Sequence, residues 1–249
     1  VGRPHKQARV LEVRLKLNNP LRMPDLAGVA QNMRGEFIPV DEAMEERADE
    51  FYNKEVNAAS WESESDFAEW LYYNDIIDAE EFFDRNAQYD KGVAVKILQE
   101  KGYDGLVYEN VVEDTGSDSY IIFDPEQVKT SEPVTRDADG KVIPLSQRFD
   151  DSKDSFLYSE LGATNDRYME LAQDPEGNKE VLQQFVKRAA ESTGYTVGPL
   201  YHGTGSKFDT FSYDKIGKGT GFQLGTGFYF TTSLDQAQVY YRPLSPVTK

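Results

Sequence analysis

Residues 200–205 read Leu-Tyr-His-Gly-Thr-Gly, and residues 225–232 read Gly-Thr-Gly-Phe-Tyr-Phe-Thr-Thr. The apolar residues around His202 and Tyr229 predict two short strands. The segment between them is rich in glycine, which lets a backbone take positive φ angles and approach a ligand closely. Ser233 is the expected N-cap of a helix that follows the second strand. A histidine at a strand end, beside a glycine and a hydroxyl and followed by tyrosines, suggests a pocket for a flat aromatic ring that carries an amide.

These motifs resemble the first half of an ADP-ribosyltransferase fold of the His-Tyr-Glu type, the class of the poly-ADP-ribose polymerases and diphtheria-toxin-like enzymes. In that family one strand carries His-Gly-Ser/Thr, which residues 202–204 match. A later strand carries Gly-x-Tyr-Phe-Thr/Ala, which residues 227–231 match. A helix then carries a second tyrosine, which is matched by Tyr240 or Tyr241.

A second group of motifs, nearer the amino end, resembles the closing half of the same fold. Residues 106–110 and 119–124 predict a hairpin whose strands flank a polar loop. In the family, Gly-Tyr-Asp-Gly leads into such a hairpin, and the final strand reads Glu-Tyr-Ile-Val-Tyr-Asp with Gln-Val after it. Here Gly-Tyr-Asp-Gly stands at 102–105, and Gln-Val stands at 127–128. The final strand is similar to that of ADP-ribosyltransferase modules in polyvalent proteins of phages and mobile elements.

The two halves stand in inverted order relative to the family. The expected division runs from a closing half through a surface linker to helices and an opening half: 1–129 (strand 8–17, acidic helices 24–101, hairpin 106–124), 130–163 and 164–249. The expected fold class is α+β, an ADP-ribosyltransferase-like split antiparallel β-sheet with a helical layer. Either the domain is circularly permuted or the chain is cut across two tandem modules. The halves would pack together within one chain or by exchange in a dimer.

The resemblance implies that NAD is bound as a substrate. The backbone of Gly203 would pair with the nicotinamide carboxamide, with support from the Thr204 hydroxyl, and His202 would bond a ribose hydroxyl. Tyr229 and Tyr240 would sandwich the nicotinamide ring. The implied NAD-binding residues are His202, Gly203, Thr204, Gly227, Tyr229 and Tyr240.

The family places its catalytic glutamate at the start of the final strand, where this chain has Ser119. A serine hydroxyl can bond a ribose hydroxyl, but it supplies no negative charge to the oxocarbenium-like state through which the nicotinamide bond breaks. Glu113 is the first candidate to replace that carboxylate. Asp118 is the second, although on a strand its side chain faces the opposite way from Ser119. The expected catalytic set is His202, Tyr229, Ser119 and Glu113.

The composition argues against several classes of binding partner and catalytic chemistry. The chain has 249 residues and a formal net charge of −17, which argues against binding to a phosphate backbone, so no nucleic acid is expected as a partner. It has no cysteine, which excludes disulfides and thiolate catalysis, and no metal spacing stands out. No apolar run approaches the roughly 20 residues of a membrane helix, and no membrane partner is expected. The chain does not start with methionine, so we expect a processed or excised piece of a longer protein.

The acidic helical region is rich in aromatic residues, which allow two interpretations. They form the buried side of a helical layer, or they form a surface on which a target docks. The residues concerned are Phe51, Tyr52, Trp61, Phe67, Trp70, Tyr72, Tyr73, Phe82 and Phe83.

Three functions remain open. The first is an NAD-dependent mono-ADP-ribosyltransferase that modifies a host protein, in the host cytoplasm after delivery by a phage or mobile element. The second is a non-catalytic module of the same fold that binds NAD or a partner, which the serine at the glutamate position favours. The third is an assembly or spacer piece of a phage polyprotein. Each site residue also has a purely structural interpretation, as a strand-end histidine, a core tyrosine, a turn hydroxyl or a loop glycine.

Overall fold

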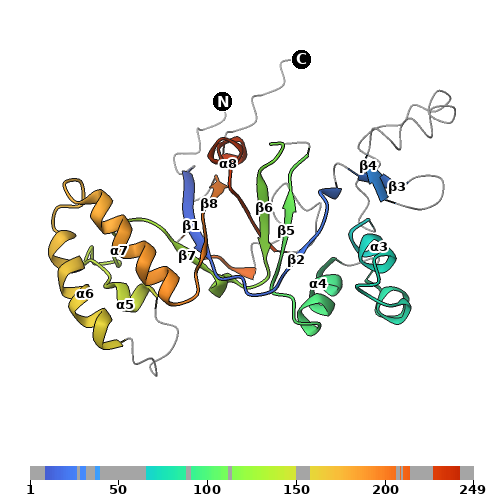
Figure 1. Ribbon diagram of the computed structural model, residues 1–249, viewed down its shortest axis with the longest axis horizontal. Coiled ribbons are helices and arrows are strands. Elements are labelled where there is room, and N and C mark those ends of the chain that lie inside the picture. Colours follow the sequence, from blue (N-terminus) through green and yellow to red (C-terminus); the bar gives the residue numbers. More distant parts are fainter. Residues whose placement is uncertain are drawn as a thin grey trace, which may run out of the picture. The chain divides into compact units, whose positions relative to one another are not determined.

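The chain divides into two compact units, and each unit takes residues from both halves of the sequence (Figure 1). The first unit comprises Val1–Leu17, Glu126–Lys207 and Thr232–Lys249, and the second comprises Asn18–Pro125 and Phe208–Thr231. The expected boundary at 130–163 is therefore not the observed one. The structure, a computed structural model, describes residues 9–26, 29–31, 37–39, 66–87, 91–111, 114–149, 158–205, 208, 210–213 and 227–241.

The first unit contains a three-stranded antiparallel sheet. β1 (Arg9–Leu15) lies between β8 (Val197–Thr204) and β7 (Val128–Thr130). The apolar–charged alternation of the amino-terminal segment correctly predicted β1, and Val13 and Leu15 are buried. The sheet therefore joins the amino end of the chain to the strand that carries the His-Gly-Thr motif.

A helical layer completes the first unit. α5 (Leu145–Arg148), α6 (Tyr158–Leu171) and α7 (Lys179–Ser192) enclose a core of Val142, Leu145, Phe149, Tyr168, Leu171, Ala172, Leu182, Val186, Ala189, Ala190 and Tyr195. Val181 of α7 points away from this core and is 45% exposed. α8 (Leu234–Tyr241) packs against β8 and β1, and the Gln236 N–H donates to Ser233 Oγ at 3.2 Å, which confirms the expected N-cap.

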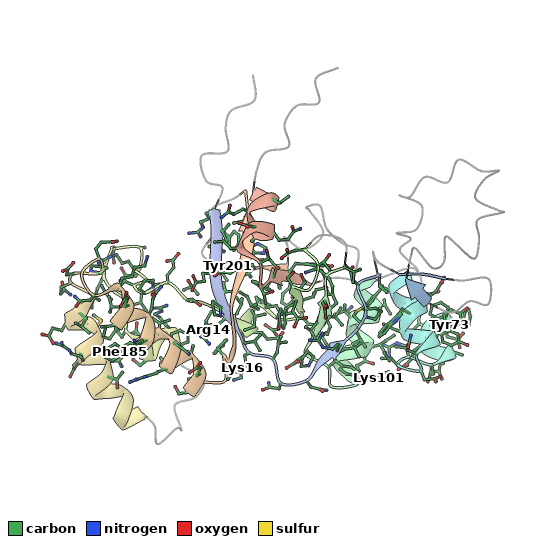
Figure 2. The ribbon with its side chains drawn as sticks, turned by 45° about the horizontal axis from the view of Figure 1, so that its top comes forward. Arg14, Lys16, Tyr73, Lys101, Phe185 and Tyr201 are labelled. Carbon is green, nitrogen blue, oxygen red and sulfur yellow. The ribbon has the colours of Figure 1, made fainter. Side chains whose placement is uncertain are left out.

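Basic side chains in or next to β1 and β7 contact the helical core of this unit, and Figure 2 labels two of them, Arg14 and Lys16. The Arg14 guanidinium lies 3.5 Å from the Glu191 carboxylate of α7. The Nζ atoms of Lys16 and Lys129 each lie 5.8 Å from the centre of the Tyr195 ring. Cations near an aromatic ring are attracted to its face, so these lysines help to hold the strands against the helical core.

The predicted surface linker at 130–163 is exposed at residues 136–141, as expected, but Ser131, Val142, Leu145, Arg148 and Phe149 are buried. Arg148 is buried and donates to the carbonyls of Thr130 (3.1 Å) and Glu132 (2.8 Å) and to the Tyr168 hydroxyl (3.1 Å). The Tyr168 hydroxyl in turn donates to the Pro133 carbonyl at 3.0 Å. Burial lowers the pKa of the Arg148 guanidinium below its ordinary value. The segment is thus fixed to the helical core, because its carbonyls satisfy a buried cation.

The second unit contains a four-stranded sheet in the order β2-β5-β6-β9. β5 (Gly105–Glu109) and β6 (Asp118–Ile122) form the hairpin that was predicted, and β9 (Phe228–Thr231) pairs with β6 antiparallel. β2 (Pro20–Arg22) pairs with β5 in parallel, so the expectation of a purely antiparallel sheet is wrong at that edge. A strand from the end of the sequence thus completes a sheet whose other strands come from the first half of the chain.

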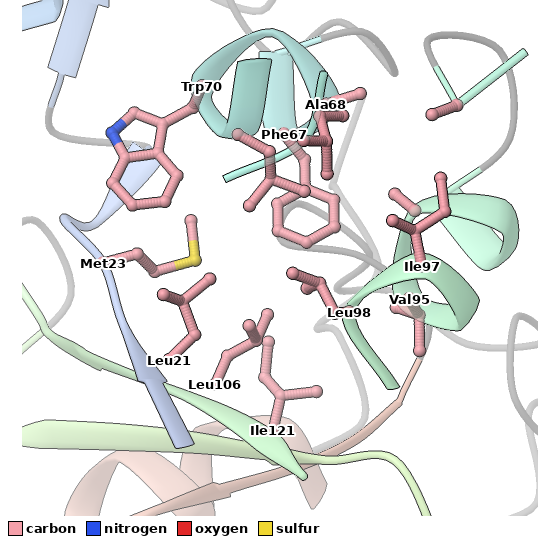
Figure 3. Packing of buried hydrophobic residues seen from close by; sticks show 14 of the residues in the cluster. Leu21, Met23, Phe67, Ala68, Trp70, Val95, Ile97, Leu98, Leu106 and Ile121 are labelled. Carbon is pink, nitrogen blue, oxygen red and sulfur yellow. The ribbon is translucent and has the colours of Figure 1, made fainter. Parts of the chain in front are cut away.

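Helices cover one face of this sheet (Figure 3). α3 (Asp66–Tyr73), a π-helical turn η3 (Glu80–Asp84) and α4 (Lys91–Glu100) bury Phe67, Trp70, Phe82, Ile97 and Leu98 against Leu106 and Ile121 of the strands. The chain leaves the sheet after Ile122 and passes through the 3₁₀ turn η4 (Pro125–Gln127) to β7 of the first unit. Phe67, Trp70 and Phe82 thus form part of the buried side of a helical layer, as the first interpretation of the aromatic residues predicted.

The prediction of helix throughout 24–101 is wrong in one described part. β3 (Val29–Gln31) and β4 (Phe37–Pro39) form a separate two-stranded antiparallel sheet. Their apolar residues come in short clusters that fit a hairpin better than a helical stripe. Residues 40–65, where another acidic helix and three of the aromatic residues were expected, lie outside the described residues.

Replacement of Arg148 with methionine should destabilise the protein by about 2–4 kcal/mol, because the two carbonyls and the phenol would lose a buried charged donor. The matched control is Arg167→Met on α6, whose side chain is 55% exposed and pairs with Glu170. That change should stay within about 0.5 kcal/mol. Urea unfolding measures both, and an equally small loss in the two variants would contradict the role given to Arg148.

Candidate functional site

The pairing of β6 with β9 brings together two residues of the predicted site. Ser119 is directly opposite Thr231, and Ile121 is directly opposite Tyr229. Because side chains alternate along a strand, Ser119 and Ile121 share a sheet face with Tyr229 and Thr231. Ser119 and Tyr229 are therefore diagonal neighbours, a spacing that long and aromatic side chains can bridge. Tyr229 is half-buried and packs against the helical core of the second unit.

The Ser119 hydroxyl is engaged by the hairpin itself. The Asn110 amide donates to Ser119 Oγ at 3.0 Å, and Ser119 Oγ lies 3.3 Å from Asn110 Oδ1. The Asn110 amide nitrogen also donates hydrogen bonds to the Ser117 carbonyl oxygen (3.0 Å) and to Ser117 Oγ (2.8 Å). Asn110 is 1% exposed and Ser119 7%. Ser119 therefore stabilises the β5–β6 connection, and its hydroxyl can turn toward a ligand only if it gives up the hydrogen bond to Asn110.

A buried carboxylate that bonds the backbone directly after Asn110 was missed by the sequence analysis. Asp25 is 6% exposed, and its Oδ2 accepts the backbone N–H of Val111 at 3.1 Å, next to Asn110. Thr231, directly opposite Ser119 on β9, is also buried. No local pattern signals Asp25, because its partner lies 86 residues away in the sequence.

Asp118 faces away from this network, as its position on the strand predicted. It pairs with Arg22 of β2 at 3.1 Å, and the Tyr120 hydroxyl donates to it at 3.4 Å. The hydrogen bond to Asp118 raises the pKa of Arg22, while burial and the nearby Asp118 charge raise the pKa of Tyr120, so both groups stay protonated near neutral pH. Asp118 is thus paired with Arg22 on the sheet face opposite to Ser119. Glu113, the first candidate to replace the family's glutamate, lies outside the described residues.

Aromatic residues hold β9 from the face opposite Tyr229. The Phe211 ring lies 5.4 Å from Phe228 and 5.5 Å from Phe230, and Phe208 lies 5.0 Å from Phe211. β9 is therefore packed on both faces, which fixes the position of Tyr229.

Gly227 has a structural role in this packing. A Cβ atom at Gly227 would overlap the Cγ2 of Ile121 and lie 2.8 Å from the Ile122 carbonyl oxygen. The glycine therefore allows β9 to enter the sheet close to β6, whatever it contributes to a ligand.

The remaining predicted residues belong to the first unit. His202, Gly203 and Thr204 are half-buried at the carboxyl end of β8, opposite Leu11, Val10 and Arg9 respectively. His202 and Thr204 share one face of the strand, since they are two residues apart. Tyr240 lies in α8, which packs against β8, but its side chain lies outside the described part of the structure.

The predicted site residues therefore fall into two sets. His202, Gly203, Thr204 and the helix that carries Tyr240 form one set in the first unit. Ser119, Gly227 and Tyr229 form the other set in the second unit.

Within the described residues, no group of three or more His, Cys, Asp or Glu side chains could hold a metal ion. In the same part of the chain, no helix combines the length and the apolar character needed to cross a bilayer. No family model, no curated protein and no solved structure matches the chain. The function of the site must therefore be inferred from the residues of this chain alone.

Replacement of Gly227 with alanine should cost about 1–3 kcal/mol of stability, because the added methyl group meets backbone that cannot move without separating β9 from β6. Gly205→Ala is the matched control, since a Cβ there meets nothing within 4 Å. It should change stability by less than about 1 kcal/mol. Chemical denaturation compares the two, and equal stability of both variants would mean that Gly227 is not needed for close strand approach.

Proposed function

We propose that the protein is an NAD-dependent mono-ADP-ribosyltransferase of the His-Tyr-Glu type with a circularly permuted, ADP-ribosyltransferase-like fold. It transfers ADP-ribose from NAD to a protein target and releases nicotinamide. The observation that carries the proposal is the register of β6 and β9, in which Ser119 and Tyr229 occupy neighbouring positions on one sheet face. These are the positions that correspond to the glutamate and tyrosine of the family.

The chain connectivity supports permutation within one chain. β6 pairs with β9, and β1 pairs with β8, so each pairing joins the expected closing half to the expected opening half. Fragments of two tandem modules would have no reason to complete each other's sheets in this way, and no second chain is needed to supply the missing strands.

The residues then have defined tasks in the reaction. The bond between the nicotinamide nitrogen and the ribose carbon breaks, and its electron pair leaves with the neutral nicotinamide. A nucleophile of the target protein attacks the same carbon and gives up a proton. His202 and the backbone at Gly203 would hold the dinucleotide, and Tyr229 would stack on the cationic ring, an interaction worth roughly 0.5–2 kcal/mol. The protein must stabilise the cationic transition state more than the bound substrate.

One specific observation favours a second candidate, a module that binds NAD or a partner without catalysis. The Ser119 hydroxyl is bonded to Asn110, and the carboxylate of the same network, Asp25, is buried and accepts a backbone N–H. Loss of one preorganised electrostatic group typically lowers the rate by about 10²–10³-fold. A slow enzyme and a binding module are therefore the two outcomes to separate.

The host and the place of action are part of the proposal. The resemblance to modules of phage polyvalent proteins suggests a target in the host cytoplasm, reached after delivery by the phage or mobile element. The net charge of −17 is compatible with a basic protein target.

The test combines labelling with binding. Incubation with biotin-labelled NAD and a bacterial lysate should label a protein, and His202→Ala should reduce the labelling by about 10²-fold or more. Glu180→Gln, an exposed carboxylate of α7, should leave it unchanged. NAD should also raise the melting temperature of the wild-type protein but not that of His202→Ala. A thermal shift without labelling would support the binding module, and the absence of both would refute an NAD site and leave the spacer piece of a polyprotein.

A further inference from the structure

Two aromatic rings of the second unit are exposed yet held in fixed positions. Tyr73, at the end of α3, is 57% exposed, and Phe83, in the η3 turn, is 54% exposed. Both rings contact Tyr72, with centroids 5.5 Å and 6.0 Å from its own. Tyr72 stacks on the buried Phe82 at 5.0 Å. The exposed rings are thus attached to the core through a third ring, and Figure 2 shows Tyr73 at the edge of α3.

Local structure explains why these rings face solvent. α3 directs Phe67, Trp70 and Leu71 into the core, so that Tyr73 falls outside the buried stripe. The η3 turn begins with reciprocal bonds, in which Asp78 Oδ1 accepts the Glu81 N–H and Glu81 Oε2 accepts the Asp78 N–H, both at 2.8 Å. In that turn Phe82 is buried, and Phe83, 4.8 Å from it between ring centres, is not.

The segment that carries the exposed rings is strongly acidic. Residues 66–87 contain seven acidic residues and one basic residue, Arg85. Arg85 pairs with Glu100 at 2.7 Å, and Lys101 pairs with Glu81 at 2.9 Å. Four further carboxylates of the segment are exposed: Asp75, Asp78, Glu80 and Asp84.

We propose that this aromatic–acidic surface, formed by Tyr72, Tyr73, Phe83 and the four exposed carboxylates, binds a segment of a partner protein that is rich in Lys or Arg and carries an apolar side chain. Cations can lie over the faces of Tyr73 and Phe83 while they neutralise the carboxylates, and the apolar side chain covers the aromatic rings. A second copy of this chain would bring like charges together, and anionic lipid headgroups would be repelled. The proposal does not depend on ADP-ribosyl transfer.

Fluorescence anisotropy with a short labelled peptide in which lysine and leucine alternate tests the proposal on the full chain. We expect binding that weakens with added salt. A variant with both Tyr73→Ser and Phe83→Ser should bind about 4–25-fold more weakly, since a cation at each exposed ring contributes about two- to five-fold. Glu80→Lys with Asp84→Lys should weaken binding by a similar factor.

Controls separate this surface from general attraction to an acidic protein. Val181→Ser and the pair Glu176→Lys with Glu180→Lys change an exposed apolar residue and two exposed carboxylates in and beside α7 of the first unit, and they should leave binding unchanged. Circular dichroism should show that all variants keep the wild-type melting temperature. Equal weakening by both sets of variants would overturn the proposal, as would equal binding of a peptide in which glutamate replaces lysine. If sedimentation shows that the wild-type protein is a dimer and that the Tyr73→Ser and Phe83→Ser variant is a monomer, the surface mediates self-association and the proposal is wrong.

Discussion

The antiparallel pairing of β6 with β9 is the constraint on which the second unit depends. β6 belongs to a hairpin near the middle of the chain, and β9 arrives from its last tenth. β9 has a packed core on one face and the Phe208–Phe211 aromatic cluster on the other, and Gly227 lets it approach β6 closely. Without β9, the hairpin would expose a strand edge and lose part of its cover, which is costly in water. The pairing of β1 with β8 has the same effect in the first unit.

The buried polar residues Asn110, Ser119 and Asp25 stabilise the β5–β6 hairpin. Asn110 and Ser119 close the hairpin, and Asp25 holds the backbone just after Asn110. A buried network of this kind is stable only when its members are satisfied, so a change in any of them affects the others. In the proposed function, Ser119 stands where the family has a glutamate, and its hydroxyl is hydrogen-bonded to Asn110. The proposal therefore allows either a slow enzyme or a binding module.

Much of the fold could be predicted from the sequence where a pattern was local. The alternation of β1, the turn residues around the β5–β6 hairpin and the Ser233 cap each depend on neighbouring residues, and each was predicted correctly. The segment 130–149 was misjudged because its composition is that of a loop. Its few apolar residues are buried only through contacts with α6 and α7, and Arg148 is satisfied by carbonyls from the same segment. Asp25 and the parallel pairing of β2 could not be predicted, since both depend on partners more than 80 residues away.

The most direct test of the account asks whether strands 118–122 and 228–231 pair within one chain. The natural chain has no cysteine, so Ser119→Cys combined with Thr231→Cys introduces one defined pair of opposed residues. Directly opposed residues lie about 4.5–5.5 Å apart between Cα atoms, within reach of a disulfide. Oxidation at low protein concentration, followed by mass spectrometry and a non-reducing gel, should give an intrachain disulfide in the monomer. The diagonal pair Ser119→Cys with Tyr229→Cys should give much less. Failure of the opposed pair to link, or links found only between two chains, would contradict the account.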